Sequence, residues 1–114
     1  MEPRLKTEIW VKALIRRAMG AGAFAAVVNH GDDTSGTVLV KVATLDGVAT
    51  VFSLARQGDG SSFWMRATGA EPVEETEADS YIRKARGFDP DLWVVEIEDR
   101  QGRHFLLEPV EGEA

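Results

Sequence analysis

The chain has 114 residues, a length at which one domain with one hydrophobic core is usual. Its hydrophobic share of 44% is too high for a disordered protein, and the absence of cysteine excludes disulfides, thiol nucleophiles and cysteine–metal sites. The formal charge of −6 is uneven, because residues 1–70 carry +2 and residues 71–114 carry −8. The acidic second half disfavours a nucleic-acid partner.

The sequence contains no segment that resembles a membrane span. The longest apolar stretch, residues 21–28, contains Gly22 and is far too short to cross a bilayer. We therefore expect a single cytoplasmic domain over residues 1–114, with frayed ends at residues 1–6 and 108–114 and no membrane partner.

Residues 7–19 are predicted to form the first helix. Thr7 is a plausible N-cap, and Gly20 and Gly22 end the helical pattern. Helical spacing places a set of apolar side chains on one side of this helix: Trp10, Val11, Leu14, Ile15 and Ala18.

Four strands are predicted next, separated by segments rich in Gly, Asp, Ser and Thr. They are residues 23–29, 37–43, 48–55 and 63–68. Between the second and third, a type I turn with Gly47 at positive φ pairs Val42 with Thr50 and Val40 with Phe52. A two-residue Asp-Gly turn would instead mix the two faces of the hairpin, so we favour the first register.

The second helix is predicted at residues 75–86. Ala78 and Ile82 lie on its apolar side, while acidic residues crowd its first turn and basic residues its last. Gly87 is expected to end the helix in a left-handed conformation, with Phe88 folding back against it.

Two further strands are predicted at residues 92–98 and 103–107, joined by a turn in which Gly102 has positive φ. This hairpin would place Glu98 opposite His104. The predicted fold is α+β, an antiparallel sheet of about six strands with both helices on one face, in the order α-β-β-β-β-α-β-β. The predicted core is Trp10, Leu14, Val40, Phe52, Ile82, Trp93, Val95 and Ile97.

Four segments carry a family resemblance: IWVKALIRR at 9–17, GAFAAVV at 22–28, GTVLVKV at 36–42 and FDPDLWVVEIEDR at 88–100. Together they resemble the short bacterial proteins catalogued as domain of unknown function 1491. The Asp-Pro-Asp-Leu-Trp stretch is the most specific part. The resemblance implies an identity but no activity, cofactor or site residue.

The loop from Asn29 to Asp33 contains the residues most similar to a metal site, namely His30, Asp32 and Asp33. Imidazole and carboxylate are proper metal ligands, but this arrangement has no recognised ligand spacing. Asp and Gly are also the residues that a hairpin loop requires, so we favour a plain loop and predict no metal and no cofactor.

An acid–base site is the second possibility for catalysis. His104 opposite Glu98, with Asp91 nearby in sequence, could form a small enzyme site. An ordinary cross-strand pair on a solvated strand face is the favoured interpretation, so no catalytic residue is assigned.

The favoured function is a non-enzymatic binding or adaptor module whose partner is another protein or a second copy. Its predicted contact surface is an open sheet face that carries Leu39, Lys41, Trp64 and Arg66. The alternative for Trp64 is that the loop at residues 56–62 or the C-terminal tail covers it. Nucleic-acid binding through the basic first helix, at Lys12, Arg16 and Arg17, is the less favoured alternative.

Overall fold

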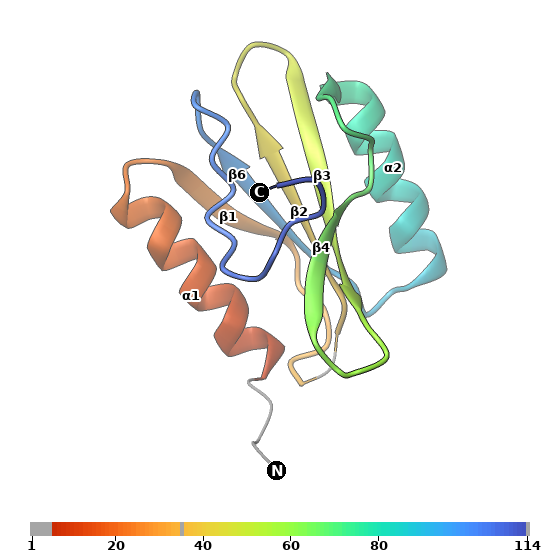
Figure 1. Ribbon diagram of the computed structural model, residues 1–114. Coiled ribbons are helices and arrows are strands. Elements are labelled where there is room, and N and C mark those ends of the chain that lie inside the picture. Colours follow the sequence, from red (N-terminus) through yellow and green to blue (C-terminus); the bar gives the residue numbers. More distant parts are fainter. Residues whose placement is uncertain (1–5, 35, 114) are drawn as a thin grey trace.

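The computed structural model describes residues 6–34 and 36–113. Two helices and six strands follow one another in the chain (Figure 1): α1 (Thr7–Gly20), β1 (Phe24–Asn29), β2 (Val38–Ala43), β3 (Val48–Arg56), β4 (Ser62–Arg66), β5 (Val73–Glu74), α2 (Glu75–Phe88) and β6 (Trp93–Glu98). The predicted α+β class is confirmed, and the long elements lie within one or two residues of their expected bounds. None of the described helices is long and apolar enough to cross a membrane.

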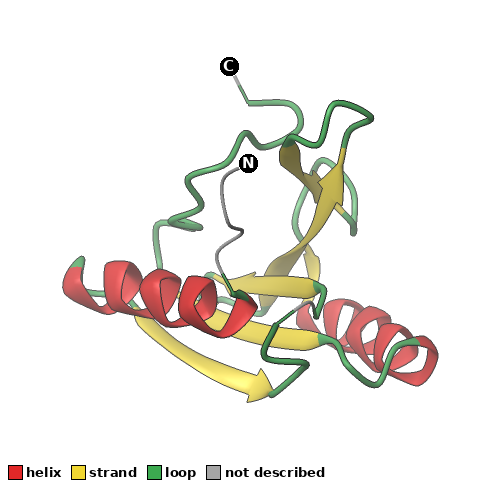
Figure 2. Ribbon diagram, turned by 90° about the horizontal axis from the view of Figure 1, so that it is seen from below, coloured by secondary structure: helices red, strands yellow, loops and turns green. Residues whose placement is uncertain are grey.

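The strands form one sheet in the order β1-β6-β2-β3-β4, with the two-residue strand β5 paired to β3. Neighbouring strands are antiparallel except β2 and β6, which run parallel. The sheet is strongly twisted, so its two end regions run at a large angle to one another (Figure 2). β6, the last strand in the chain, lies inside the sheet, because β1 and β2 pair with it on either side.

The two helices lie on opposite faces of this sheet, and the expectation that both cover one face is wrong (Figure 1). α1 packs on the face that carries Val40 and Val95. α2 packs on the face that carries Leu39 and Val94. Buried apolar side chains lie on both faces of β2 and of the beginning of β6, as in strands that are covered from both sides.

The core on the α1 face contains most of the residues predicted for it. Leu14, Val40, Phe52, Trp93, Val95 and Ile97 are buried there, and Ile82 is buried on the α2 face. Trp10 is only partly buried, at the border of this core.

The β2–β3 hairpin has the predicted register. Val42 pairs with Thr50 and Val40 with Phe52, and Gly47 has a φ of 97°. Gly102 also has the predicted positive φ, 71°.

The predicted last hairpin does not form. After the turn at Gly102, residues 103–107 contain no strand, and Phe105 itself has a φ of 60°. The physical reason is that β6 already pairs with β1 on one side and β2 on the other, so no edge is left for another strand.

The C-terminal segment, residues 103–113, instead runs to the far edge of the sheet, where β4 lies. The amide of Trp64 in β4 donates to the oxygen of Pro109, and the amide of Glu111 donates to the oxygen of Trp64, both at 2.8 Å. Residues 108–113 are thus bonded to β4 rather than frayed as expected. Residues 1–5 and 114, the rest of the predicted frayed ends, lie outside the described part of the chain.

Both helix ends differ in detail from the prediction. α1 begins at Thr7 itself. The Thr7 hydroxyl does not cap this helix but donates to the backbone of the loop before β2. α2 continues through Gly87 to Phe88, and the Phe88 side chain is 91% exposed rather than folded back.

Candidate functional site

The predicted contact surface does not exist as one exposed face. Leu39 and Lys41 are buried beneath α2, whereas Trp64 is buried on the opposite face. Arg66 lies on the Trp64 side and forms an ion pair with Glu113 at 3.0 Å. The alternative in which the C-terminal tail covers Trp64 is the one observed.

The predicted pair of Glu98 and His104 does not form either. His104 Nδ1 accepts a hydrogen bond from the amide of Leu106 at 2.9 Å, and Nε2 lies 2.9 Å from a Glu113 carboxylate oxygen. This network assigns the tautomer in which Nε2 carries the proton and donates to Glu113. With both ring nitrogens engaged, His104 has no free nitrogen with which to act as a base.

The segment around Pro90 is held by hydrogen bonds. Asp89 accepts hydrogen bonds from the Thr37 hydroxyl at 2.7 Å and from the amide of Asp91 at 3.0 Å. The Asp91 backbone oxygen in turn accepts from the amide of Asp32 at 3.0 Å. These bonds fasten the segment before β6 to the loop before β2.

The loop that resembled a metal site contains one cluster of donor atoms. Glu8 joins His30 and Asp33, with one ligand atom of each within 4.8 Å of the others. His30 Nε2 lies 2.7 Å from an Asp33 carboxylate oxygen, and both side chains are well exposed. Asn29 points elsewhere, because its side-chain amide donates to the chain before β6 at 2.6 Å. The cluster lies on an exposed loop beside the start of α1.

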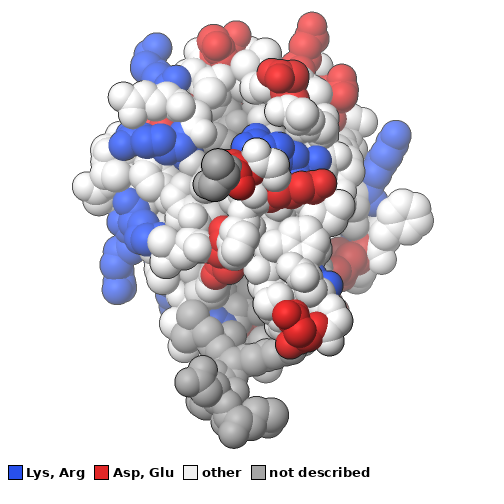
Figure 3. All heavy atoms as spheres, viewed as in Figure 1, with Lys and Arg blue, Asp and Glu red and all other residues white. Residues whose placement is uncertain are grey.

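Two of the three basic residues predicted as a surface on α1 already have partners within the protein. Figure 3 shows lysine and arginine side chains gathered on the side of the molecule that α1 occupies. Arg17 donates twice to the Phe105 backbone oxygen, at 2.9 and 3.1 Å, and Lys12 lies 3.6 Å from Glu8. This leaves Arg16 as the exposed and unpaired member of the predicted basic set among the described residues.

Two tryptophans share one carboxylate at the border of the α1-side core. The indole N–H of Trp10 donates to Glu108 Oε2 at 3.1 Å, and that of Trp64 donates to Oε1 at 3.0 Å. The two ring centroids lie 5.4 Å apart. Burial alone would raise the pKa of Glu108, but the two indole donors and the positive charge of Arg17 outweigh it and lower this pKa. Glu108 is therefore ionised at neutral pH.

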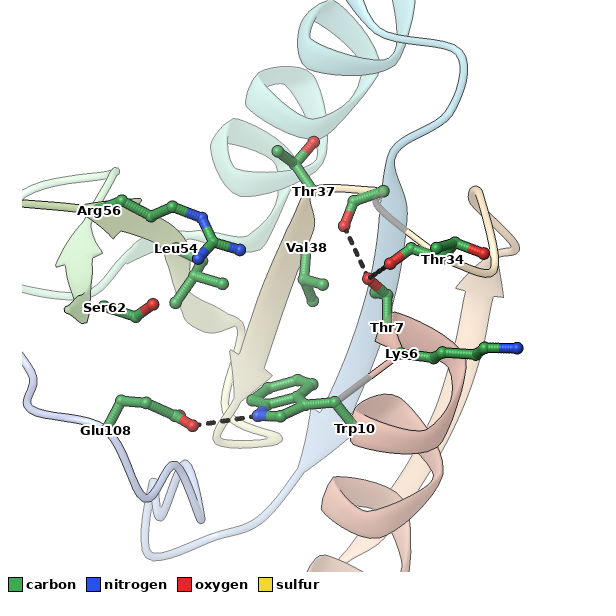
Figure 4. Close-up of a pocket in the computed structure, with 11 residues that line it drawn as sticks. Lys6, Thr7, Trp10, Thr34, Thr37, Val38, Leu54, Arg56, Ser62 and Glu108 are labelled. Carbon is green, nitrogen blue, oxygen red and sulfur yellow. Dashed lines mark hydrogen bonds between the residues drawn. The ribbon is translucent and has the colours of Figure 1, made fainter. Parts of the chain in front are cut away.

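A pocket of about 490 Å³ opens next to this carboxylate, between the start of α1, strands β2 to β4 and the C-terminal segment. Trp10, Val38 and Leu54 give it apolar walls (Figure 4). The remaining lining residues are polar or charged, apart from a glycine: Lys6, Thr7, Thr34, Gly36, Thr37, Arg56, Ser62 and Glu108. The volume lies in the range of small-molecule sites, and the lining is more polar than that of most such sites.

Arg56 is the cation that faces this space. Figure 4 shows its guanidinium group directed toward Leu54, whereas the Lys6 ammonium group points away from the other lining residues. Arg56 comes from the end of β3, where it pairs with Ser62 of β4. Neither side chain has a hydrogen-bond or ion-pair partner among the described residues. Both are available to a ligand.

The loop before β2 forms the opposite wall of the pocket and is held firmly. The Thr7 hydroxyl donates to the oxygens of Thr34 and Gly36, each at 3.3 Å. From the other side, the Trp93 indole N–H donates to the oxygen of Asp32 at 2.7 Å. The pocket wall is therefore anchored both to α1 and to the start of β6.

Replacing Gly31 by alanine is expected to lower the free energy of unfolding by about 1–3 kcal/mol. A Cβ at this position would lie 2.6 Å from Trp93 Cδ1 and closer still to the Asp91 oxygen, and backbone cannot move aside cheaply. Gly58→Ala is the matched control, because it has open space around it and should change stability by less than about 0.5 kcal/mol. Urea unfolding of both variants measures the difference, and equal stabilities would contradict the tight loop packing.

Sequence reasoning missed Arg56 and Glu108 as site residues. Arg56 was placed in a loop, and Glu108 in a frayed tail. One signal was present, because a buried Trp64 needs a partner for its indole N–H, and a carboxylate is a strong acceptor. The sequence offers several carboxylates, so this signal could not select Glu108.

Comparison with known proteins points to one family. Residues 5–107 match the family described as "Protein of unknown function (DUF1491)". A crystal structure of a DUF1491 family protein from Caulobacter crescentus CB15 is 54% identical and has a TM-score of 0.87, with 95% of this chain and all of that one covered. A solution structure of a protein from A. tumefaciens is 32% identical with a TM-score of 0.77, and 98% of this chain and all of that one are covered. No curated protein matches the chain.

Proposed function

This chain belongs to the DUF1491 family, whose description assigns no activity, and we propose that it is a non-enzymatic binding module for a small organic anion. The ligand carries a carboxylate and an apolar or aromatic body, and it binds in the pocket between α1 and the β3–β4 hairpin. The observation that carries the proposal is Arg56, an arginine that has no partner among the described residues and faces a pocket walled by Trp10.

The charges around the pocket favour an anion over a cation. The negative charge of Glu108 is already bound by two indole N–H groups, whereas the positive charge of Arg56 has no partner among the described residues. A guanidinium group binds a carboxylate through two parallel hydrogen bonds. The Ser62 hydroxyl beside it adds one further donor, and Trp10, Val38 and Leu54 contact the apolar body of the ligand.

The lining residues also favour binding over acid–base catalysis. Glu108 is the lining carboxylate, and a carboxylate with a lowered pKa is a weak base at neutral pH. No histidine lines the pocket within the described residues, and His104 has both ring nitrogens engaged elsewhere.

Titration of the protein labelled with ¹⁵N at its tryptophans tests this proposal. We expect benzoate and indole-3-acetate to shift the indole N–H resonance of Trp10, with dissociation constants of about 1–10 mM for ligands of this size. The neutral amide benzamide should bind at least about tenfold more weakly, because it lacks the charge that pairs with Arg56.

Two arginine variants separate the pocket from general electrostatic attraction. Arg56→Gln should abolish the preference for benzoate over benzamide, whereas Arg100→Gln, an exposed arginine on the turn after β6, should leave it unchanged. Equal binding of acid and amide by the unmodified protein, or no shift with any probe at 20 mM, would contradict the proposal.

A further inference from the structure

The sheet has two edges, and the described chain covers one of them. Along the outer edge of β4 runs the C-terminal segment, bonded through Pro109 and Glu111 to Trp64. β1 lies at the other end of the sheet and pairs only with β6 (Figure 1). Its outer edge therefore presents backbone groups without a partner among the described residues, which is a template for another strand.

The exposed edge at β1 is apolar and carries no charge. Phe24 and Val28 are 53% and 52% exposed, and Val27 is exposed as well. Edge strands that must stay alone are usually protected by lysine, proline or a bulge. β1 contains neither lysine nor proline, and its bulge between Val27 and Asn29 leaves the first four residues regular.

Unpaired charges of opposite sign lie at the two ends of β1, both on the α2 side of the sheet. Glu98 of β6 lies opposite Phe24 at the beginning of the strand. Arg83 and Arg86 of α2 line a surface hollow together with Asn29 at its end. None of these three charged side chains forms an ion pair with a described residue.

We propose that the protein forms a homodimer through antiparallel pairing of β1 with β1 of a second copy. The two-fold axis then stands perpendicular to the sheet, and one continuous sheet runs through both copies. Antiparallel pairing places the beginning of each β1 beside the end of the other, so Glu98 of one copy comes to the same end as Arg83 and Arg86 of its partner. This match occurs twice by symmetry, and no like charges meet on the neutral strands.

This interface is separate from the proposed ligand pocket. The pocket is lined from the side of the sheet where β3 and β4 lie, whereas the interface is at β1. Arg56→Gln should therefore leave the dimer intact, and loss of dimerisation should leave ligand binding intact, so each proposal can fail without the other.

Sedimentation equilibrium of the full chain at concentrations from 5 to 500 µM tests the proposal. We expect a monomer–dimer equilibrium that Val27→Lys weakens at least tenfold, because it brings two positive charges together near the two-fold axis. Leu45→Lys, at a similarly exposed apolar position on the β2–β3 turn, is the matched control and should leave association unchanged. Thermal unfolding checks that both variants are folded. A monomer at 500 µM, or equal effects of the two lysines, would overturn the proposal.

A charge exchange tests the orientation of the two strands. Glu98→Arg alone, and Arg83→Glu with Arg86→Glu, should each weaken the dimer about tenfold or more by placing like charges at both ends. All three substitutions in one chain should restore association to within about threefold of the unmodified protein, because the opposite charges then meet again. A triple variant that associates no better than the partial ones would overturn the antiparallel arrangement.

Discussion

Trp64→Ala is expected to lower the free energy of unfolding by about 3–5 kcal/mol and the unfolding midpoint by roughly 10 °C or more. The Trp64 side chain is fully buried, packs against Trp10 and contributes one of the two indole donors to Glu108. Its removal leaves a cavity beneath the C-terminal segment and deprives a partly buried carboxylate of a hydrogen bond. Urea denaturation monitored by circular dichroism measures the loss.

Trp64→Phe separates packing from hydrogen bonding. Phenylalanine keeps an aromatic ring in the core but cannot donate to Glu108, so the expected loss is smaller, about 1–3 kcal/mol. A loss below about 1 kcal/mol for Trp64→Ala would show that the ring is dispensable for the core, against the burial described here.

Lys41→Met is expected to cost about 3 kcal/mol at pH 7. The Lys41 ammonium group is almost fully buried beneath α2, where it lies 2.7 Å from Glu75 and Asp79 and 3.7 Å from Glu96. Methionine keeps the length of the side chain but leaves three carboxylates without their common cation. Removing one member of a buried ion pair costs about 3–5 kcal/mol, and the lower end applies because Glu75 and Asp79 are 39% and 44% exposed.

The cost of Lys41→Met should decrease as the pH falls. Burial alone would lower the pKa of Lys41, but hydrogen bonds to Asp79 and Glu75 outweigh it and raise this pKa, so the contribution of Lys41 is fully present at pH 7 and is lost only when alkaline pH passes the raised value. Burial also raises the pKa of Glu96. The protonated form of Glu96 therefore stabilises the folded state at acid pH, and this contribution is lost as the pH rises through the raised pKa.

The cost decreases at acid pH because protonated carboxylates no longer repel one another. Urea unfolding of the unmodified protein and of Lys41→Met at pH 7 and at about pH 4.5 measures this decrease. Lys12→Met, at an exposed lysine of α1, is the control and should change stability by less than about 0.5 kcal/mol at either pH. A cost of Lys41→Met that is the same at both pH values would contradict the role of the uncompensated carboxylates.

Local pattern was sufficient to predict most elements of this fold but not their layers. Helical spacing located both helices, and the glycine of the β2–β3 turn fixed the register of that hairpin. Leu39 indicated that the sheet has apolar residues on a second face, but this face was interpreted as an exposed contact surface. A second helix that covers this face explains the same residue, and the choice between the two depends on contacts between distant segments.

The position of β6 caused the other errors. A strand with a turn and an apolar segment after it normally forms a hairpin, so residues 103–107 were predicted to pair with it. Because β6 lies between β1 and β2, that pairing is impossible, and the C-terminal segment is free to cover Trp64. The candidate pocket depends on this crossing, since Glu108 reaches Trp10 only through it.

The central place of β6 also determines when the fold can form during synthesis. The first two strands, β1 and β2, do not pair with each other in the sheet, because both pair with β6, which begins 50 residues after the end of β2. Until residues 93–98 have emerged, a nascent chain holds α1 and β1 apart from the β2–β3–β4 meander, and the edges of β1 and β2 that β6 will join remain open. Contacts between segments this distant in sequence slow folding, and the strand edges that stay unpaired during this time are prone to aggregation. A nascent chain from which residues 93–98 have not yet emerged is therefore expected to be prone to aggregation, whereas one from which they have emerged can place its central strand between β1 and β2.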